Sequence, residues 1–175
     1  MHRPAVYLIT GPMAAGKSTV ARLLASRFER GVHLEGDVFR RFVVSGREEP
    51  GPDMSRAALE QLRLRYRLAA AAADTYFEAG FDVALEDVVG GTLLEECWTM
   101  IRSRPCHLVV LLPSVEAVAE REEAREDKGY VGGWTVERHY AEFVETTPRL
   151  GLWLDTTEQT PQETVDEILR AVPPS

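Results

Sequence analysis

The stretch "YLITGPMAAGKSTVARLL", residues 7–24, decides the fold of this chain. An apolar run leads into the loop Gly11–Ser18, which matches the pattern G-x-x-x-x-G-K-[ST], and apolar residues at helical spacing follow. In such a strand–loop–helix unit, the backbone N–H groups of the loop and the positive end of the helix dipole point toward one anion. The stretch therefore predicts a loop that holds the phosphates of a nucleotide.

Individual side chains of this loop have predicted tasks. Lys17 is expected to reach the β- and γ-phosphates, and the Ser18 hydroxyl to ligate Mg²⁺. The chain has only two lysines among its 20 basic residues, so a chance match to the pattern is rare. We expect ATP as the nucleotide, without excluding GTP, and Mg²⁺ as the metal. The predicted nucleotide-binding residues are Gly11, Pro12, Met13, Ala14, Ala15, Gly16, Lys17, Ser18 and Thr19.

Apolar runs alternate with helical patterns along the rest of the sequence, which is typical of parallel strands joined by helices. A chain of 175 residues is long enough for one core, so we expect one domain, residues 1–175. The predicted fold is α/β, a P-loop NTPase fold with a five-stranded parallel sheet, helices on both faces and a short lid. Its strands are expected at residues 5–10, 32–35, 81–86, 107–112 and 151–155.

Composition narrows the possible partners. The net charge of −8 disfavours a nucleic-acid binder, because phosphate backbones require a basic surface. The longest apolar run, residues 108–113, is too short to span a membrane. Residues 1–10 lack the features of a secretory signal, and Cys97 and Cys106 fit free thiols, so we expect a cytoplasmic protein that acts on a small molecule. The sequence leaves the oligomeric state open.

A switch, a motor and a kinase all share such a phosphate loop. A GTPase needs a guanine-reading N/T-K-x-D sequence after a late strand, and neither "PSVEAV" nor "TTEQT" supplies it. The sequence "DVVG", residues 87–90, imitates the D-x-x-G of GTPases with two fixed positions only. Motor ATPases are usually larger. A kinase is therefore favoured, and a regulatory ATPase or GTPase is the competing class.

Residues 37–67 are predicted to bind the acceptor. Asp37 follows the second strand at the sheet edge that carries the phosphate loop, where a carboxylate can take the proton of an acceptor hydroxyl. It could equally be the N-cap of a helix expected over residues 37–45. Arg40 and Arg41 are predicted to contact the substrate. Arg63 and Arg67 share a helix face, although Glu60 could instead pair with Arg63 or Arg65 on a solvated surface.

A lid is predicted over residues 121–134, "REEAREDKGYVGGW". Arg121 and Arg125 lie four residues apart near the end of a helix that runs into a glycine-rich loop. Their guanidinium groups are expected to close over the transferring phosphate. Pairing with the neighbouring glutamates on an exposed helix is the alternative.

Two acids, Glu86 and Asp87, end the third strand. One is expected near Mg²⁺ and the other at the acceptor hydroxyl. Side chains alternate along a strand, so only one can point at the metal. The residues alone do not decide between them; our assignment gives Asp87 to the metal and Glu86 to the substrate.

The phosphate loop, Asp37, "LEDVVGG", "VEAVAEREEAR" and "LDTTEQTPQE" together resemble the chloramphenicol phosphotransferase-like kinases over about residues 7–171. The chain is more distantly similar to tunicamycin-resistance proteins, zeta-type toxins, and shikimate and gluconate kinases. The resemblance implies that Asp37 is the base toward the acceptor hydroxyl and that lid arginines around 121–125 contact nucleotide phosphates. Two departures stand out: Glu86-Asp87 replaces the Asp-Asp pair of the family, and residues 40–67 carry several arginines.

These observations predict an ATP-dependent phosphotransferase that moves the γ-phosphate to a hydroxyl of a small molecule, such as an antibiotic. The predicted catalytic residues are Asp37, Lys17, Arg121 and Arg125. The arginines of residues 40–67 make a polar or anionic acceptor at least as plausible as a phenicol. A toxin-type kinase that acts on a nucleotide sugar is a further alternative.

Overall fold

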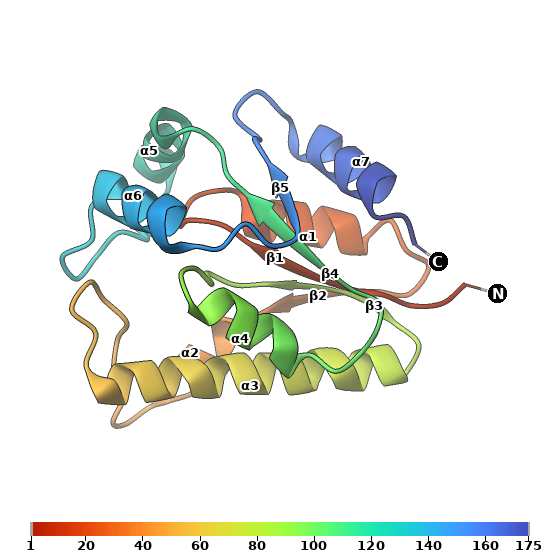
Figure 1. Ribbon diagram of the computed structural model, residues 1–175, viewed down its shortest axis with the longest axis horizontal. Helices are drawn as coiled ribbons and strands as arrows, with labels where there is room; N and C mark the ends of the chain where they lie inside the picture. Colours follow the sequence, from red (N-terminus) through yellow and green to blue (C-terminus); the bar gives the residue numbers. More distant parts are fainter. Residues whose placement is uncertain (1, 175) are drawn as a thin grey trace.

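The computed structural model describes residues 2–174. Five parallel strands form one sheet in the order β2-β3-β1-β4-β5 (Figure 1). This is the five-stranded α/β sheet expected from the sequence, with no strand bound shifted by more than one residue. The strands are β1 (Val6–Thr10), β2 (Gly31–Glu35), β3 (Asp82–Glu86), β4 (Cys106–Leu111) and β5 (Leu152–Leu154).

Helices cover both faces of the sheet (Figure 1). Helices α1 and α7 pack on one face, while α3 and α4 pack on the other. Helices α5 and α6 stand together at one end of the sheet, and the short α2 follows β2. The bounds are α1 (Lys17–Ala25), α2 (Val38–Arg41), α3 (Arg56–Glu78), α4 (Leu93–Met100), α5 (Val115–Ala124), α6 (Val136–Thr146) and α7 (Pro161–Ala171).

The central strand β1 is buried on both faces, as expected for a parallel sheet between helix layers. Tyr7 and Ile9 point into the core formed with α1 and α7, whereas Val6 and Leu8 point into the core formed with α3 and α4. Burying each such aliphatic side chain stabilises the fold by roughly 2 kcal/mol. The strand that leads into the phosphate loop is therefore held by both helix layers.

The helix expected over residues 37–45 is much shorter, because α2 contains only Val38–Arg41. Two β-branched residues, Val43 and Val44, follow it, and Gly46 adopts a left-handed conformation with φ 76°. Both features disfavour a continuing helix. The chain therefore leaves α2 early and forms an extended loop, residues 42–55, which we call the acceptor loop.

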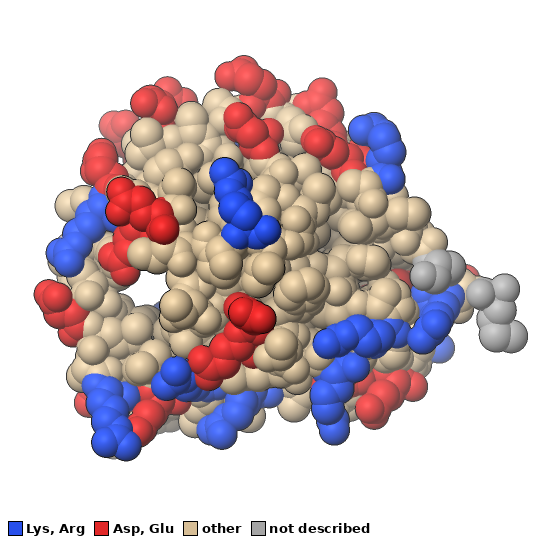
Figure 2. Space-filling view, viewed as in Figure 1, with Lys and Arg blue, Asp and Glu red and all other residues tan. Residues whose placement is uncertain are grey.

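The carboxyl ends of the strands bring the functional loops to one edge of the sheet, where ligands bind in such folds. The acceptor loop meets the lid loop, residues 125–135, across this edge. A Cβ on Gly51 would lie 3.7 Å from the carbonyl oxygen of Gly132, and one on Gly133 would lie 3.7 Å from Pro52. Figure 2 shows a gap between these two loops on the face in view. Within residues 2–174, the longest helices remain too polar or too short to cross a bilayer.

Candidate active site

The phosphate loop runs from β1 into α1 and keeps its shape through two glycines. Gly16 has φ 88°, and Gly11 packs so closely on β4 that a Cβ would overlap the carbonyl oxygen of Leu111. Only glycine fits these positions. Residues 13–19 of the predicted nucleotide-binding set line a large cleft, while Gly11 and Pro12 form the base of the loop.

Lys17 lies buried inside the loop. Its ammonium group donates a hydrogen bond of 2.9 Å to the carbonyl oxygen of Pro12. Burial lowers the pKa of Lys17 to about 8, against the opposing charges of Glu86 and Asp87. The lysine is thus held at the loop by a neutral partner, and its charge is not cancelled by a directly bonded carboxylate.

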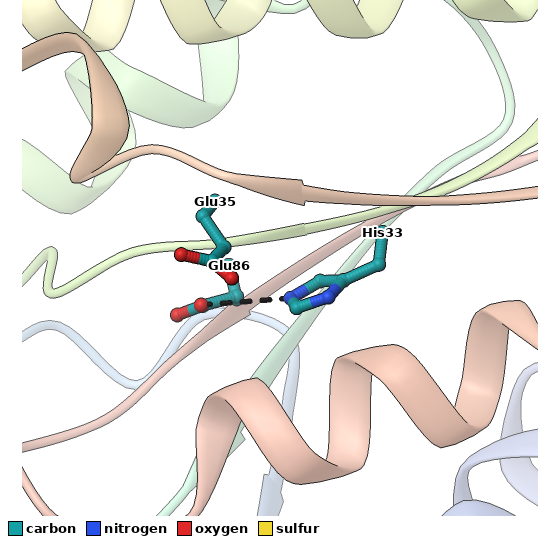
Figure 3. A group of neighbouring side chains, drawn as sticks. All are labelled: His33, Glu35 and Glu86. Carbon is teal, nitrogen blue, oxygen red and sulfur yellow. Dashed lines mark ion pairs between the residues drawn. The ribbon is translucent and has the colours of Figure 1, made fainter.

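Glu86 lies beside the phosphate loop, with its carboxylate toward the start of α1. Ser18 Oγ donates a hydrogen bond of 2.7 Å to Glu86 Oε1, and His33 Nε2 lies 3.6 Å from the same oxygen (Figure 3). Burial opposes ionisation, but the nearby His33 ring, the Ser18 hydrogen bond and the charge of Lys17 lower the pKa of Glu86. Oxygen ligands from a hydroxyl and an ionised carboxylate match the preference of Mg²⁺.

This arrangement reverses our assignment of the two acids. Asp87, which the sequence analysis gave to the metal, turns to the opposite face of the sheet and forms a buried two-pronged ion pair with Arg65 of α3. Alternation along the strand sends Glu86 toward α1 and Asp87 toward α3. Sequence reasoning gave the alternation but could not say which face held the phosphate loop.

Asp37 stands at the rim of the cleft, where 47% of its side chain is exposed. It precedes α2, but its own backbone is helical, with φ −61° and ψ −20°, and its side chain makes no capping hydrogen bond. The carboxylate instead accepts a bond of 2.9 Å from Arg40 Nε. Partial burial opposes ionisation, but the Arg40 hydrogen bond and the charges of Arg65, Arg40 and Arg41 lower the pKa of Asp37.

Most other arginines of residues 37–67 also contact acids. Arg40 pairs with Glu49 of the acceptor loop at 2.8 Å, and Arg41 lies 3.7 Å from Glu35. Arg63 pairs with Glu96 of α4, and Glu60 pairs with Arg56, so the expected Glu60 pairing with Arg63 or Arg65 is wrong. The arginines here are largely neutralised.

The two lid arginines differ in their contacts. Arg121 lies against the phosphate loop, and its guanidinium donates to the carbonyl oxygens of Ala15 and Thr156, both at 3.2 Å. Arg125 follows α5 and lies 3.4 Å from Glu122, three residues away. Both line the cleft, and their closure over a phosphate stays a prediction.

Sequence reasoning missed three residues that fix the lid or the phosphate loop. Tyr130 donates a hydrogen bond of 2.7 Å to the carbonyl oxygen of Met13, and the Met13 N–H donates to His139 Nε2 at 3.4 Å. The buried carboxylate of Glu122 accepts hydrogen bonds from the N–H groups of Gly129 and Tyr130. Burial, helped by the charge of Lys17, lowers the pKa of His139 to about 4 and keeps it neutral.

Most of the predicted site residues line one cleft of about 1530 Å³ at the carboxyl edge of the sheet, among them Lys17, Ser18, Asp37, Glu86, Arg121 and Arg125. Its phosphate end holds Lys17, Ser18 and Arg121, and its acceptor end holds Asp37 and Arg40. Apolar side chains of Met54, Leu62, Tyr66, Trp134 and Phe143 complete its walls. The cleft can hold a nucleotide and a second molecule side by side.

The comparison with known families decides the classification. The family described as "Chloramphenicol phosphotransferase-like protein" matches residues 5–173. The chain belongs to this family. A search of curated proteins finds no match.

Solved structures share the fold over nearly the whole chain. The tunicamycin resistance protein of Deinococcus radiodurans is 19% identical, with a TM-score of 0.72. The match covers 99% of this chain and 98% of the resistance protein. A sugar kinase of Janibacter sp. HTCC2649 is 18% identical, with a TM-score of 0.69 and coverage of 97% and 96%. The APS kinase of Mycobacterium tuberculosis, in complex with AMPPNP and APS, is 17% identical, with a TM-score of 0.66 and coverage of 97% and 98%. At these identities the likeness shows the small P-loop kinase fold.

Proposed function

We propose that the protein transfers the γ-phosphate of ATP to a hydroxyl of a small molecule, with Mg²⁺ as cofactor. One observation carries the proposal: the phosphate loop and the ionised Asp37 face the same cleft, from neighbouring parts of one sheet edge. Phosphoryl transfer needs little more than aligned reactants and neutralised charge, so this juxtaposition is the main requirement. The kinase names among the structural relatives, one of them bound to AMPPNP, support ATP as the donor.

Each residue has a role in the proposed reaction. Lys17, the loop N–H groups and Arg121 hold and neutralise the β- and γ-phosphates, and Arg125 completes the charged shell. Asp37 accepts the proton of the acceptor hydroxyl as its oxygen attacks phosphorus. Ser18 and Glu86 would hold Mg²⁺, which, when bound, neutralises charge on the phosphate oxygens.

The acceptor is proposed to be an uncharged hydroxyl compound, such as an antibiotic. The family description and the tunicamycin resistance relative support a resistance role. The arginines that made an anionic acceptor plausible contact Asp37, Glu49, Glu96 and Asp87, so they offer little free positive charge. Two buried free cysteines, Cys97 and Cys106, support work in a reducing cytoplasm.

A transfer screen tests the proposed function. The purified protein is incubated with ATP and Mg²⁺ and a panel of phenicols, nucleosides, aminoglycosides and sugars, and products are read by the mass gain of one phosphate. Each hit is compared with an anionic analogue that carries an added carboxylate, which should be a poorer acceptor. A regulatory ATPase would release ADP at the same rate whether or not an acceptor is present, and that result would refute the proposal.

Asp37→Asn tests the base. Transfer should fall roughly 10³-fold while nucleotide affinity changes little, because an amide cannot accept the proton. Asp53→Asn, on the exposed acceptor loop, is the matched control and should transfer normally. Near wild-type turnover of Asp37→Asn would remove this residue from the mechanism.

A further inference from the structure

Arg65 is the most deeply buried arginine near the cleft. It comes from α3, and 9% of its side chain is exposed, against 3% for its partner Asp87. Its Nε and Nη2 both donate to the Asp87 carboxylate. Burial alone would lower the pKa of Arg65, but the Asp87 carboxylate raises it. Burial raises the pKa of Asp87, and the Arg65 guanidinium opposes that shift.

The remaining nitrogen of this guanidinium lies beside the proposed base. Arg65 Nη1 lies 3.3 Å from Asp37 Oδ1, the same oxygen that accepts the 2.9 Å bond from Arg40 Nε. The other oxygen, Asp37 Oδ2, has one longer contact, 3.4 Å from Arg40 Nη2. Two cations thus hold Oδ1, and Oδ2 retains a lone pair that can receive a proton.

Neither stability nor substrate charge explains this arrangement. A buried ion pair is often no more stabilising than apolar residues of the same volume. The charge of Arg65 is already matched by Asp87, so it is not free to bind an anionic group of an acceptor. What the two-pronged pair does supply is a guanidinium plane in one fixed orientation.

The packing around Asp87 also helps to fix the orientation of the Arg65 guanidinium. Asp87 Oδ1 also accepts a hydrogen bond of 2.8 Å from the N–H of Val88, which fixes the carboxylate. Gly36, next to Asp37, leaves the space that the carboxylate fills, because a Cβ there would overlap Asp87 Oδ2. Three segments, from β2, β3 and α3, converge on one guanidinium.

We propose that Arg65 is a positioning residue: clamped by Asp87, it holds Asp37 Oδ1 and thereby presents Oδ2 to the acceptor hydroxyl. This inference rests on the proposed function through the role of Asp37 as the base. Arg65 touches neither nucleotide nor acceptor in this scheme and acts through Asp37.

Arg65→Lys is the informative variant. A lysine keeps the charge opposite Asp87, so the buried acid stays paired, but a single ammonium cannot bridge two carboxylates as the planar fork does. A second variant guards against misfolding of Arg65→Lys. The double variant Arg65→Gln/Asp87→Asn removes both buried charges at similar volume and leaves no unpaired charge in the core. Arg63→Lys is the matched control, because Arg63 lies on the same helix and forms a half-exposed pair with Glu96.

The kinetic arm is a double-mutant cycle with Asp37→Asn. ATP turnover is followed with water as the acceptor and with any acceptor from the transfer screen. Arg65→Lys should lower kcat about tenfold in the wild type, leave KM for ATP unchanged, and have less than about a twofold effect in the Asp37→Asn background. An equal loss in both backgrounds, or no loss in the wild type, would overturn the proposal.

The second arm does not depend on activity. The same four proteins are unfolded in urea, and the folding equilibrium constants should show a coupling of about fivefold between Arg65→Lys and Asp37→Asn, absent for Arg63→Lys. No coupling would refute the contact. If the wild-type protein transfers phosphate to no acceptor, the proposed function is refuted. The unfolding experiment still tests the contact between Arg65 and Asp37.

Discussion

The phosphate end and the acceptor end of the cleft treat their cations differently. At the phosphate end, Lys17 and Arg121 donate to backbone carbonyl oxygens, which carry a dipole and no net charge. At the acceptor end, Arg40 and Arg65 face carboxylates. Arg125 of the lid also contacts a carboxylate, that of Glu122, and so follows the pattern of the acceptor end.

The difference shows what each end is built to receive. A cation held by a carbonyl keeps most of its attraction for a phosphate, whereas a cation paired with a carboxylate has little left. The acceptor end uses its arginines to shape and orient acids. Counting basic residues along the sequence therefore overstates the free positive charge of the acceptor end, because the net field depends on pairing.

Lys17→Ala should break the phosphate end most severely. We expect kcat/KM to fall roughly 10³-fold, or about 4 kcal/mol of transition-state stabilisation, because the lysine neutralises the transferring phosphate. Steady-state kinetics and nucleotide titration measure the loss.

The chain provides its own control for this variant in Lys128, the other lysine. Lys128 binds the carbonyl oxygens of Glu122 and Glu123 at the end of α5, away from the floor of the loop. Lys128→Ala should cost less than about threefold. Similar losses in both variants would mean that Lys17 has no special role.

Arg121→Gln should have the next largest effect. It removes an uncompensated charge beside Ala15, and we expect roughly a 10²-fold loss of transfer. Arg125→Gln should cost about tenfold or less, because Glu122 already offsets that charge. A larger loss for Arg125 than for Arg121 would contradict the distinction between carbonyl-held and carboxylate-paired cations.

Gly36→Ala tests how tightly the acceptor end is packed. The added methyl group would overlap the Asp87 carboxylate, and we expect a loss of about 2 kcal/mol in unfolding free energy. Gly51→Ala is the control, since its Cβ would meet only the Gly132 carbonyl oxygen at 3.7 Å. Equal unfolding midpoints for the two variants would argue against the close approach of Asp87.

His139 should give an effect of similar size to that of Gly36→Ala, visible as a pH dependence. Its pKa is lowered from 6.5 to about 4 in the folded protein, so between these values the unfolded chain binds more protons. Stability should therefore fall on acidification, by about 2 kcal/mol between pH 7 and pH 5. In His139→Gln, which can still accept from Met13, urea unfolding should show a correspondingly smaller difference between the two pH values.

The sequence predicted those parts of the site that are local. The loop Gly11–Ser18 is contiguous, and its strand–loop–helix context fixes it without distant contacts. The parallel sheet followed from alternating apolar and helical patterns, and the strand order then placed Asp37 at the same edge. Each of these features depends on spacing that can be counted in one segment.

The missed features depend on contacts between distant segments. His139 meets Met13 across 126 residues, and Arg65 meets Asp87 across 22. Alternation separated Glu86 from Asp87, but only the packing of α1 and α3 on opposite faces decides which acid meets Ser18. Such pairings are properties of the packed helices and cannot be read from a single segment.

The scarcity of lysine makes the phosphate end chemically addressable. Lys17 and Lys128 are the only side-chain amines in the chain, and both line this cleft. Because the pKa of Lys17 is about 8, a useful fraction is an unprotonated nucleophile in mildly alkaline solution. An acylating reagent small enough to enter would label that end and spare every arginine. The labelled mass, with and without a nucleotide, would then report loop occupancy in a single spectrum.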